Sequence, residues 1–421
     1  MNVRPITNPA GPGLVEALET WTARIATAAG PSAAHMFSAM MLDTWCTTMS
    51  RIDDRTFVIT GDIPAMWLRD SSAQVLPFLS LVDVPEVVDV LRGVVREQWR
   101  CVALDPYANA FNASDTGAHY DADDLELHPG VWERKYEIDS LAFPVQLAHQ
   151  LWQATGDSSH LDDAVHAGCR DIVALWRTEQ RHEDASPYAH IRPAHPQDTL
   201  GQDGRGTAVA ITGMTWSGFR PSDDACAFGY NIPAQLMAVM ALRMIAEFAD
   251  VWKDPTLGAD AEALGAEINS GVETHGMVEG RFAYEVDGLG NQLCMDDANM
   301  PSLLSLPLTS DVTAEDRRYL ATRQWILSPA NPFYFRGSVA SGIGSPHTPE
   351  RYIWHIALAV QGLTGDMQEA RRCLEVLMAT DGGTGRMHEG FHVDDPTQFT
   401  REWFSWANSM ACALMMRIAS D

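Results

Sequence analysis

The sequence predicts an all-α protein whose helices are arranged in a ring, an α-toroid. Segments with apolar residues three and four positions apart recur along almost the whole chain, which indicates amphipathic helices. Strand signals are few and short. The polar, aromatic and glycine-dense segments fall between the expected helices or at their starts.

About a dozen helices of similar length are expected from this spacing. Their starts are placed by the first periodic residue and by caps such as Thr313-Ala-Glu-Asp and Thr348-Pro-Glu. No repeat of about 30–45 residues is visible, which disfavours an open solenoid. The expected ranges are 13–29, 32–50, 66–80, 85–101, 138–155, 160–181, 229–250, 258–270, 297–307, 313–327, 350–364, 366–379 and 399–418.

Three short strands are expected, at 57–60, 209–212 and 282–286. The last precedes Asp287-Gly-Leu-Gly-Asn, a turn sequence that predicts a hairpin. No Pro/Gly/Ser-rich linker divides the chain, so residues 1–421 are predicted to form a single catalytic domain. The few hairpins are expected in the loops at one mouth of the ring, where distant stretches of sequence can converge.

Composition limits the partners. The chain has 421 residues, 46% of them hydrophobic, and a formal net charge of −27. This acidic balance argues against a nucleic-acid partner and against docking on an anionic membrane. A neutral, polyhydroxylated substrate is compatible with it. The oligomeric state is left open.

The N-terminal residues lack the apolar core of a signal peptide, and no run approaches the roughly 18 apolar residues of a membrane span. A cytoplasmic location is therefore expected. Seven scattered cysteines without metal-site spacing are expected to be reduced thiols.

The segment TGDIPAMWLRDSSAQ at 60–74 carries the densest chemistry. Asp62 and Pro64 alone would suit a helix start. That reading leaves Trp67, Arg69 and Asp70 unexplained. An indole beside charged and amide groups suits a wall that packs on a sugar and hydrogen-bonds its hydroxyls.

The segment 212–230 contains two adjacent carboxylates, Asp223 and Asp224, near Trp216 and Arg220. Helix capping would account for one carboxylate, since an N-cap side chain satisfies free backbone amides. Two exceed what capping needs. A general acid must hold its proton near neutral pH, and a neighbouring carboxylate or burial raises its pKa.

The segment 385–408 places His388 and Glu389 in a glycine-flanked loop that leads to an aromatic helix. Glu389 is predicted to be functional. The sequence His388-Glu-Gly-Phe-His392 also matches the pattern of zinc proteases, but that motif works only on a helix. The surrounding glycines and Pro396 make a helix improbable here, so the match is interpreted as chance.

Two further segments are ambiguous between turns and a binding site. His347, in Gly342-Ile-Gly-Ser-Pro-His, is either a sugar ligand or a turn residue. Asp297, in Asp296-Asp-Ala-Asn-Met-Pro, either caps a helix or binds substrate.

Paired carboxylates with aromatic side chains are what glycoside cleavage requires. One acid protonates the leaving oxygen, and a second carboxylate acts on the anomeric carbon directly or through water. The residues so far therefore predict a glycosidase.

With these residues in view, the chain resembles glycoside hydrolase family 125, the exo-α-1,6-mannosidases. The resemblance extends from about residue 60 to 409. It rests on GDIPAMWLRDSSAQ at 61–74, TGMTWSGFRPSDDA at 212–225, DDANMPSLLSLP at 296–307, GIGSPHTPERYIW at 342–354, MHEGF at 387–391 and FTREWFSWANS at 399–409.

The resemblance implies an (α/α)6 barrel and a metal-independent, inverting removal of a non-reducing terminal α-1,6-linked mannose, with no cofactor. The general base falls on Glu389, and the general acid on Asp223 or Asp224. The substrate is expected to be a mannose-containing oligosaccharide, of N-glycan type or another α-mannoside. His355 departs from the proline expected after Tyr352-Ile-Trp. The expected substrate-binding residues are Asp62, Trp67, Arg69, Asp70, Trp216, Arg220, Asp297, His347, His388 and Arg401.

Other function classes remain open on the residues alone. A Mg-dependent isoprenoid cyclase would hold diphosphate with Asp123-Asp124 or Asp296-Asp297. A zinc protease would use His388 and His392, and a catalytically inactive carbohydrate-binding protein would bind mannosides only. Among hydrolases, another α-linkage or another hexose is the alternative.

Overall fold

The structure, a computed structural model, describes residues 8–121, 127–192 and 198–421. Contacts within the chain divide it into two compact units, each assembled from separate stretches of sequence. Unit 1 comprises Met1–Glu97, Gln150–Gly156 and Pro332–Asp421, and unit 2 comprises Gln98–His149 and Asp157–Asn331. The single catalytic domain over 1–421 therefore stays a prediction.

Two helices pass from one unit to the other, α4 (Pro85–Leu104) and α5 (Ile138–Thr155). The remaining helices of unit 1 are α1 (Pro12–Ala29), α2 (Pro31–Asp43), a π-helical turn (Thr44–Thr48), α3 (Leu68–Val75), a 3₁₀ turn (Leu76–Leu81), α13 (His355–Thr364), α14 (Met367–Ala379) and α15 (Ser405–Ile418). Its strands are β1 (Met49–Ile52), β2 (Arg55–Val58), β3 (Met66–Trp67), β11 (Tyr334–Arg336), β12 (Ser341–Ile343), β13 (Tyr352–Trp354), β14 (Gly390–His392) and β15 (Asp395–Phe399).

The helix α15 forms the core of unit 1. It is buried over almost its whole length and contacts α2, α3, α13 and α14. A small antiparallel sheet, β13-β14-β15, lies next to α13 in the sequence and pairs Tyr352 with His392 and Trp354 with Gly390. This pairing places Glu389 directly before β14.

The helices of unit 2 are α6 (Asp163–Glu179), α7 (His182–Ala185), α8 (Gly201–Gly204), α9 (Ile232–Trp252), α10 (Pro255–His275), α11 (Leu306–Thr309) and α12 (Arg317–Ile326). Its strands are β4 (Ala110–Phe111), β5 (Val131–Glu133), β6 (Tyr230–Asn231), β7 (Met277–Val278), β8 (Arg281–Phe282), β9 (Glu285–Val286) and β10 (Gln292–Leu293). Antiparallel pairs join β4 to β5, β7 to β8, and β9 to both β6 and β10.

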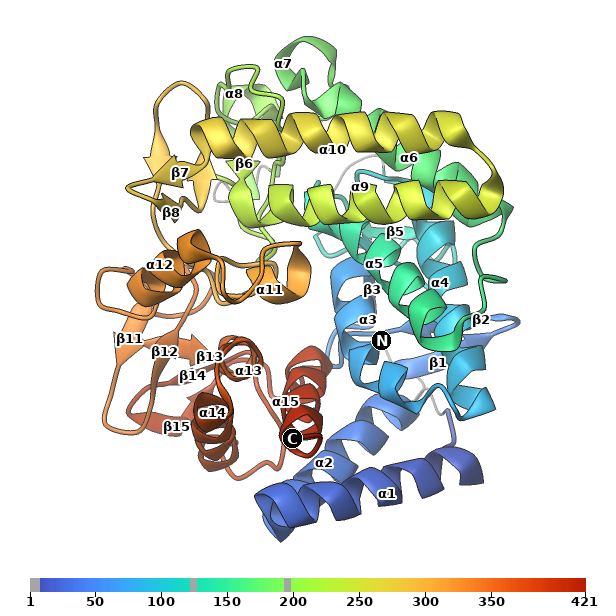
Figure 1. Cartoon of the computed structure of the whole chain (residues 1–421), viewed down its shortest axis with the longest axis vertical. Helices are drawn as coiled ribbons and strands as arrows, with labels where there is room; N and C mark the ends of the chain where they lie inside the picture. The colour runs from blue at the N-terminus through green and yellow to red at the C-terminus, as the bar shows by residue number, and fades with distance from the viewer. Residues whose placement is uncertain (1–7, 122–126, 193–197) are drawn as a thin grey trace. The chain divides into compact units, whose positions relative to one another are not determined.

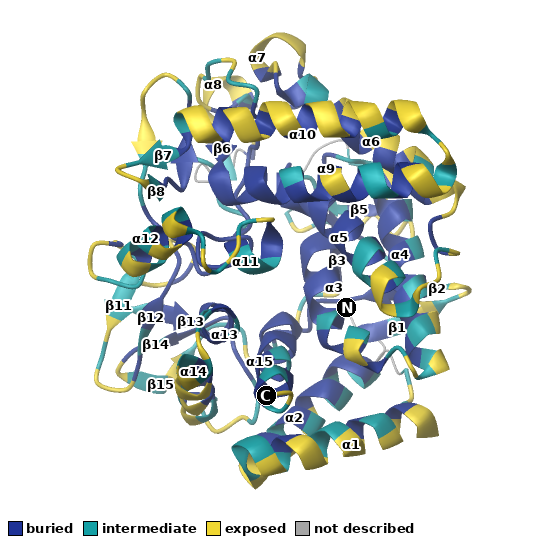
Figure 2. Cartoon of the chain, viewed as in Figure 1, coloured by how far each residue is buried: buried dark blue, intermediate teal, exposed yellow. Residues whose placement is uncertain are grey.

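The helices α9 and α10 form a hairpin, and Figure 1 shows them side by side. Asn231 and Asp254 cap their N-termini with side-chain oxygens. Gly265 of α10 faces Leu242 of α9, which allows close packing. Figure 2 shows α9 largely buried, whereas α10 exposes one face.

One described helix, α9, is long and apolar enough to cross a membrane by length and composition alone, contrary to the expectation of no such run. Of its apolar window, 78% is buried inside the structure. That burial is the behaviour of a core helix.

The all-α class is confirmed, because the strands of the described residues are only two to five residues long and the helices dominate. Most expected helices are present with shifted ends. Three were extended too far: residues 297–305, 350–354 and 399–404 are not helical. Residues 352–354 form β13 instead, because Tyr352, Ile353 and Trp354 pair with β14.

The expected caps also differ from the observed ones. Helix α12 begins after Asp316, whose carboxylate accepts from the Arg318 amide, rather than after Thr313. Residues 349–354, directly after Thr348, are not helical. Among the strands, 57–58 and 285–286 are observed and the hairpin at 287–291 is confirmed, whereas 209–212 is not a strand. The seven cysteines are free thiols, as expected.

Candidate active site

In unit 1, the segment 60–74 is not a helix start at Asp62. Helix α3 begins only at Leu68, so Asp62 and Pro64 precede it. The Asp62 carboxylate instead contacts Arg401, with both oxygens 3.1 Å from Nε. The capping interpretation of Asp62 is therefore wrong.

Arg69 and Asp70 lie in the first turn of α3 and are almost fully buried, at 2% and 5% exposure. Burying a charge is costly unless it has partners. Their own separation is 3.7 Å between Nε and Oδ2, and the Arg69 guanidinium lies 5.9 Å from the ring centre of Trp406. Trp67, also buried, immediately precedes the helix. These three residues therefore form a rigid, charged helix start.

Arg401 lies among three carboxylates of unit 1. Its guanidinium is 3.8 Å from Glu389, hydrogen-bonds Asp62 and Thr60, and interacts electrostatically with Asp70. Burial opposes its charged form, but the hydrogen bond to Asp62 and the charges of Glu389, Asp62 and Asp70 raise the pKa of Arg401. Arg401 thus presents a permanent positive charge to Glu389, which is 8% exposed.

His388 is fully buried, and its ring is fixed by the protein. It stacks on Phe399 with ring centres 3.7 Å apart, and its two nitrogens lie 3.2 Å and 3.1 Å from the carbonyl oxygens of Arg401 and Asp381. This geometry favours a role of His388 in supporting the main chain next to Glu389. Direct binding of substrate by His388 stays a prediction. Because residues 390–392 form a strand, the helix that a zinc-protease motif requires is absent from this described segment.

His347 is exposed in a turn before β13, and its amide contacts Ser345 Oγ at 3.1 Å. Its ring meets the edge of Trp354 at 6.4 Å. A sugar-binding role for His347 stays a prediction.

In unit 2, Asp223 and Asp224 occupy a tight turn rather than a helix cap. The Asp223 amide donates to the Arg220 carbonyl at 2.9 Å, and the Arg220 amide donates to the Asp224 carbonyl at 2.8 Å. Asp223 has φ of 66°, a strained backbone region for a residue other than glycine. The next helix, α9, is capped by Asn231 instead. The capping interpretation of this pair is therefore wrong.

Asp223 belongs to a buried polar cluster. Asn109 Nδ2 lies 3.3 Å from Asp223 Oδ1, 3.1 Å from Glu133 and 3.5 Å from Glu137. The Lys135 ammonium donates to the Asp223 carbonyl at 2.7 Å and is 3.7 Å from Glu133. One amide and one ammonium thus hold three carboxylates together.

Burial, together with the charge of Asp223, raises the pKa of Glu133, although Lys135 and Arg192 oppose the shift. The pKa of Lys135 is also raised: burial lowers it, but Glu133, Asp223 and Asp198 outweigh that effect. The cluster therefore combines a cation that stays charged with one carboxyl group, that of Glu133, whose pKa is raised.

Sequence reasoning missed Asn109, Glu133 and Lys135. They lie in a stretch between two expected helices, and none of the three stands next to an acidic residue. The one available signal was Val131-Trp-Glu-Arg-Lys, in which charged residues continue a short apolar strand.

Three other predicted residues of unit 2 have structural partners. Trp216 stacks on His182 at 3.5 Å and is 1% exposed. Arg220 pairs with buried Glu285, whose other oxygen accepts the amides of 227 and 228. Asp297 Oδ1 accepts the Asn299 amide at 3.2 Å in a turn, without capping a helix. These contacts favour roles in shaping the site, and their substrate-binding roles stay predictions.

Of the two acidic pairs proposed for a cyclase, Asp296-Asp297 is buried and hydrogen-bonded within the protein. Asp296 is buried and accepts the amides of Leu303 and Leu304. Asp123 and Asp124 lie outside the described residues. Within the residues that the structure describes, no group of three or more His, Cys, Asp or Glu side chains is arranged to hold a metal ion.

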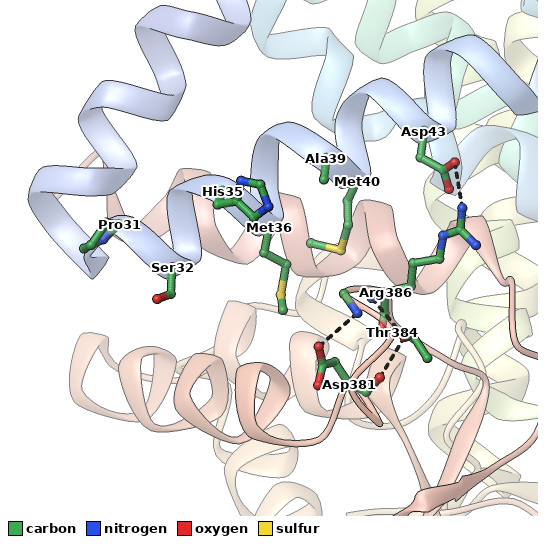
Figure 3. Close-up of a pocket in the computed structure, with 11 residues that line it drawn as sticks. Pro31, Ser32, His35, Met36, Ala39, Met40, Asp43, Asp381, Thr384 and Arg386 are labelled. Atoms are coloured by element: carbon green, nitrogen blue, oxygen red, sulfur yellow. Dashed lines mark hydrogen bonds and ion pairs between the residues drawn. The ribbon is translucent and has the colours of Figure 1, made fainter.

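A separate cavity of about 720 Å³ lies in unit 1 between α2 and the segment 381–386. Figure 3 shows Met36, Met40 and Asp43 of α2 facing Asp381 and Arg386 across it. Asp43 and Arg386 are paired at 3.2 Å. None of the predicted site residues lines this cavity.

Comparison with known proteins identifies the family. Residues 30–416 match the family model of metal-independent α-mannosidases, GH125. The chain belongs to glycoside hydrolase family 125. It is thus a glycoside hydrolase and an α-mannosidase, as the resemblance implied.

Two individual proteins similar to this GH125 chain agree with the family assignment. It is similar to a Streptococcus pneumoniae metal-independent α-mannosidase solved in a non-productive complex with α-1,6-mannobiose, with 44% identity, a TM-score of 0.93 and coverage of 96% of this chain and 98% of that one. It is also 37% identical to the meiotically up-regulated gene 157 protein of Schizosaccharomyces pombe, over 91% of this chain and 81% of that protein.

A more distant likeness concerns the fold alone. The glucoamylase of Saccharomycopsis fibuligera has 10% identity and a TM-score of 0.58, over 100% of this chain and 97% of that one. These neighbours and the helical content confirm the (α/α)6 class for the GH125 chain.

Proposed function

We propose that this GH125 enzyme removes a non-reducing terminal mannose from α-1,6-linked oligosaccharides and releases it with inverted configuration. The observation that carries the linkage is the complex of the S. pneumoniae relative with α-1,6-mannobiose, at 44% identity over nearly the whole chain. The resemblance of the motif blocks to exo-acting enzymes supports the terminal position of the cleaved residue.

Glu389 is the general base. Its carboxylate lies 3.8 Å from the Arg401 guanidinium, which keeps a permanent positive charge beside it. Glu389 removes a proton from water as the water oxygen bonds to the anomeric carbon. A hydrogen-bonded base placed in this way contributes about 10²–10⁴-fold to the rate.

Asp223 or Asp224 is the general acid. It donates its proton to the glycosidic oxygen as the bond from that oxygen to the anomeric carbon breaks. Asp223 shares the Asn109 amide with the buried Glu133, so its carboxyl group is part of a cluster of acidic side chains. Asp224 is held by Ser222 Oγ at 3.4 Å and remains the alternative acid.

Charged side chains of unit 1 supply the sugar contacts in this proposal. Arg69, Asp70 and Asp62 offer donors and acceptors to hydroxyl groups, and Trp67 offers an apolar face. Fixed side chains need no reorganisation as charge develops at the anomeric carbon, which favours the transition state over the bound substrate.

The deciding experiment incubates the purified protein with α-1,6-, α-1,3- and α-1,2-linked mannobiose, with and without EDTA, and follows the released anomer by NMR. We expect β-mannose from the 1,6 isomer and no effect of the chelator. Release from another isomer, or of α-mannose, would contradict the linkage or the stereochemistry. No release from any isomer would favour another hexose or a binding role.

A further inference from the structure

His355 contacts the main chain of the segment that carries Glu389. It is the first residue of α13 and is fully buried. Its Nδ1 is 2.7 Å from the backbone nitrogen of His388, and its Nε2 is 3.1 Å from Thr380 Oγ1. The imidazole therefore bridges the start of α13, the end of α14 and the residue before Glu389.

The hydrogen bonds define the form of this imidazole. Nδ1 lies 2.7 Å from the His388 nitrogen and 3.1 Å from the His388 carbonyl oxygen, and the shorter contact, in which the N–H donates, belongs to the tautomer with its proton on Nε2. Thr380 Oγ1 donates to the Val376 carbonyl at 2.8 Å, so it accepts the proton of Nε2. Burial, reinforced by the charge of His388, lowers the pKa of His355 to about 3. The neutral imidazole that makes both bonds thus persists at working pH.

The residues on both sides of Glu389 are fixed. On one side, His388 is tied to His355 through its amide and to the Arg401 and Asp381 carbonyls through its ring. On the other, the Gly390 amide donates to Thr400 Oγ1 at 3.0 Å, and Gly390 pairs with Trp354 in the sheet. Among the described contacts, the hydrogen bond to His355 joins the His388 amide to α13.

We propose that His355 is a positioning residue for Glu389: its imidazole accepts the His388 N–H and so fixes the main chain from which the Glu389 carboxylate reaches toward Arg401. This inference rests on the proposed role of Glu389 as general base. A base must be held to within about 0.5 Å of its productive position, and a displacement of about 1 Å can cost about 10²-fold in rate.

Two substitutions separate the hydrogen bond from the packing. His355→Phe keeps a ring against Phe391, whose centre is 4.6 Å from that of His355, but removes the acceptor. His355→Asn places an amide oxygen near the position of Nδ1 and keeps the acceptor. We expect kcat on α-1,6-mannobiose to fall about 10- to 100-fold in the Phe variant, with KM within about twofold, and to be largely restored in the Asn variant.

A buried histidine of unit 2 provides the matched control. His160 is 1% exposed, and its Nε2 lies 2.8 Å from the Ala148 carbonyl. His160→Phe should lower the melting temperature without changing kcat. If His355→Phe does not fold, His355→Gln replaces it, because its longer side chain also leaves the Nδ1 position without an acceptor.

Azide distinguishes a misplaced base from general damage. On an activated aryl α-mannoside, azide attacks the anomeric carbon without needing deprotonation and gives β-mannosyl azide and the phenolate. We expect azide to accelerate Glu389→Ala and His355→Phe, and to leave the wild type and His160→Phe unchanged.

Three results would overturn the inference: normal kcat in His355→Phe, a loss of kcat that azide does not relieve, or equal losses in the Phe and Asn variants. Failure of the underlying function would look different. If Glu389→Ala itself retained full activity, Glu389 would not be the base, whatever the His355 variants did.

Discussion

At the scale of single residues, the predicted acid and base lie in contrasting electrostatic surroundings. Glu389 is next to a guanidinium that stays charged, whereas Asp223 shares an amide donor with the buried carboxylates Glu133 and Glu137. The candidate base thus lies beside a cation, and the candidate acid belongs to an acidic cluster that Lys135 joins through its hydrogen bond to the Asp223 carbonyl.

Replacing Glu389 tests the base. We expect Glu389→Gln to fold normally and to lose about hundredfold or more of kcat on α-1,6-mannobiose, since the amide cannot take a proton from water. Glu375→Gln, an exposed change on α14, is the matched control and should leave kcat unchanged. Nearly normal turnover by the Glu389 variant would remove it from the role.

Two substrates with different leaving groups identify which aspartate is the general acid. The asparagine variant of the true acid should lose about 10²–10⁴-fold on α-1,6-mannobiose but much less on 2,4-dinitrophenyl α-mannoside, whose phenolate leaves without protonation. Rates of Asp223→Asn and Asp224→Asn on both substrates provide the measurement. Equal losses on both substrates in both variants would argue that neither aspartate is the acid.

At the scale of elements, close helix contacts depend on small residues. A Cβ at Gly168 of α6 would collide with the ring of buried Trp99 in α4, whereas a Cβ at Gly258 of α10 would meet Ala249 at an ordinary 3.4 Å. Both glycines are in helices, so alanine brings the same gain in helix propensity at each.

We therefore expect Gly168→Ala to lower the free energy of unfolding by about 1–3 kcal/mol through overpacking. Gly258→Ala should be neutral or stabilising by up to about 1 kcal/mol. Urea unfolding of the two variants measures the difference. If the Gly168 variant were as stable as the Gly258 variant, α6 and α4 would be able to move apart without a loss of unfolding free energy.

At the scale of the whole molecule, two buried histidines make stability depend on pH. Burial, with the charges of Arg192 and Lys135, lowers the pKa of His190 to about 4, and that of His355 is about 3. Both values lie below the ordinary 6.5. The unfolded chain therefore binds more protons than the folded chain below about pH 6.5, and the stability that these groups contribute above that pH is lost as the pH falls toward 4.

Each histidine contributes up to about 1.4 kcal/mol per pH unit to this slope. We expect His190→Gln and His355→Asn each to reduce the dependence of the unfolding free energy on pH between 6.5 and 4, as measured by urea unfolding. An unaltered slope in the buried-site variants would show that those histidines bind protons equally in the folded and unfolded chain.

The sequence by itself determined the helical class, most of the helices and the family, because helix periodicity and long motif blocks are local properties of the chain. It also selected Glu389 and the pair Asp223-Asp224 as the residues to test. It could not distinguish a helix from a strand at 352–354, where pairing with β14 outweighs the local pattern.

Only the tertiary structure placed Asn109, Glu133 and Lys135 against Asp223, and His355 behind His388. These partners are distant in sequence and carry no motif. Their effect depends on distances of about 3 Å and on the removal of water, and both arise only when the chain has folded.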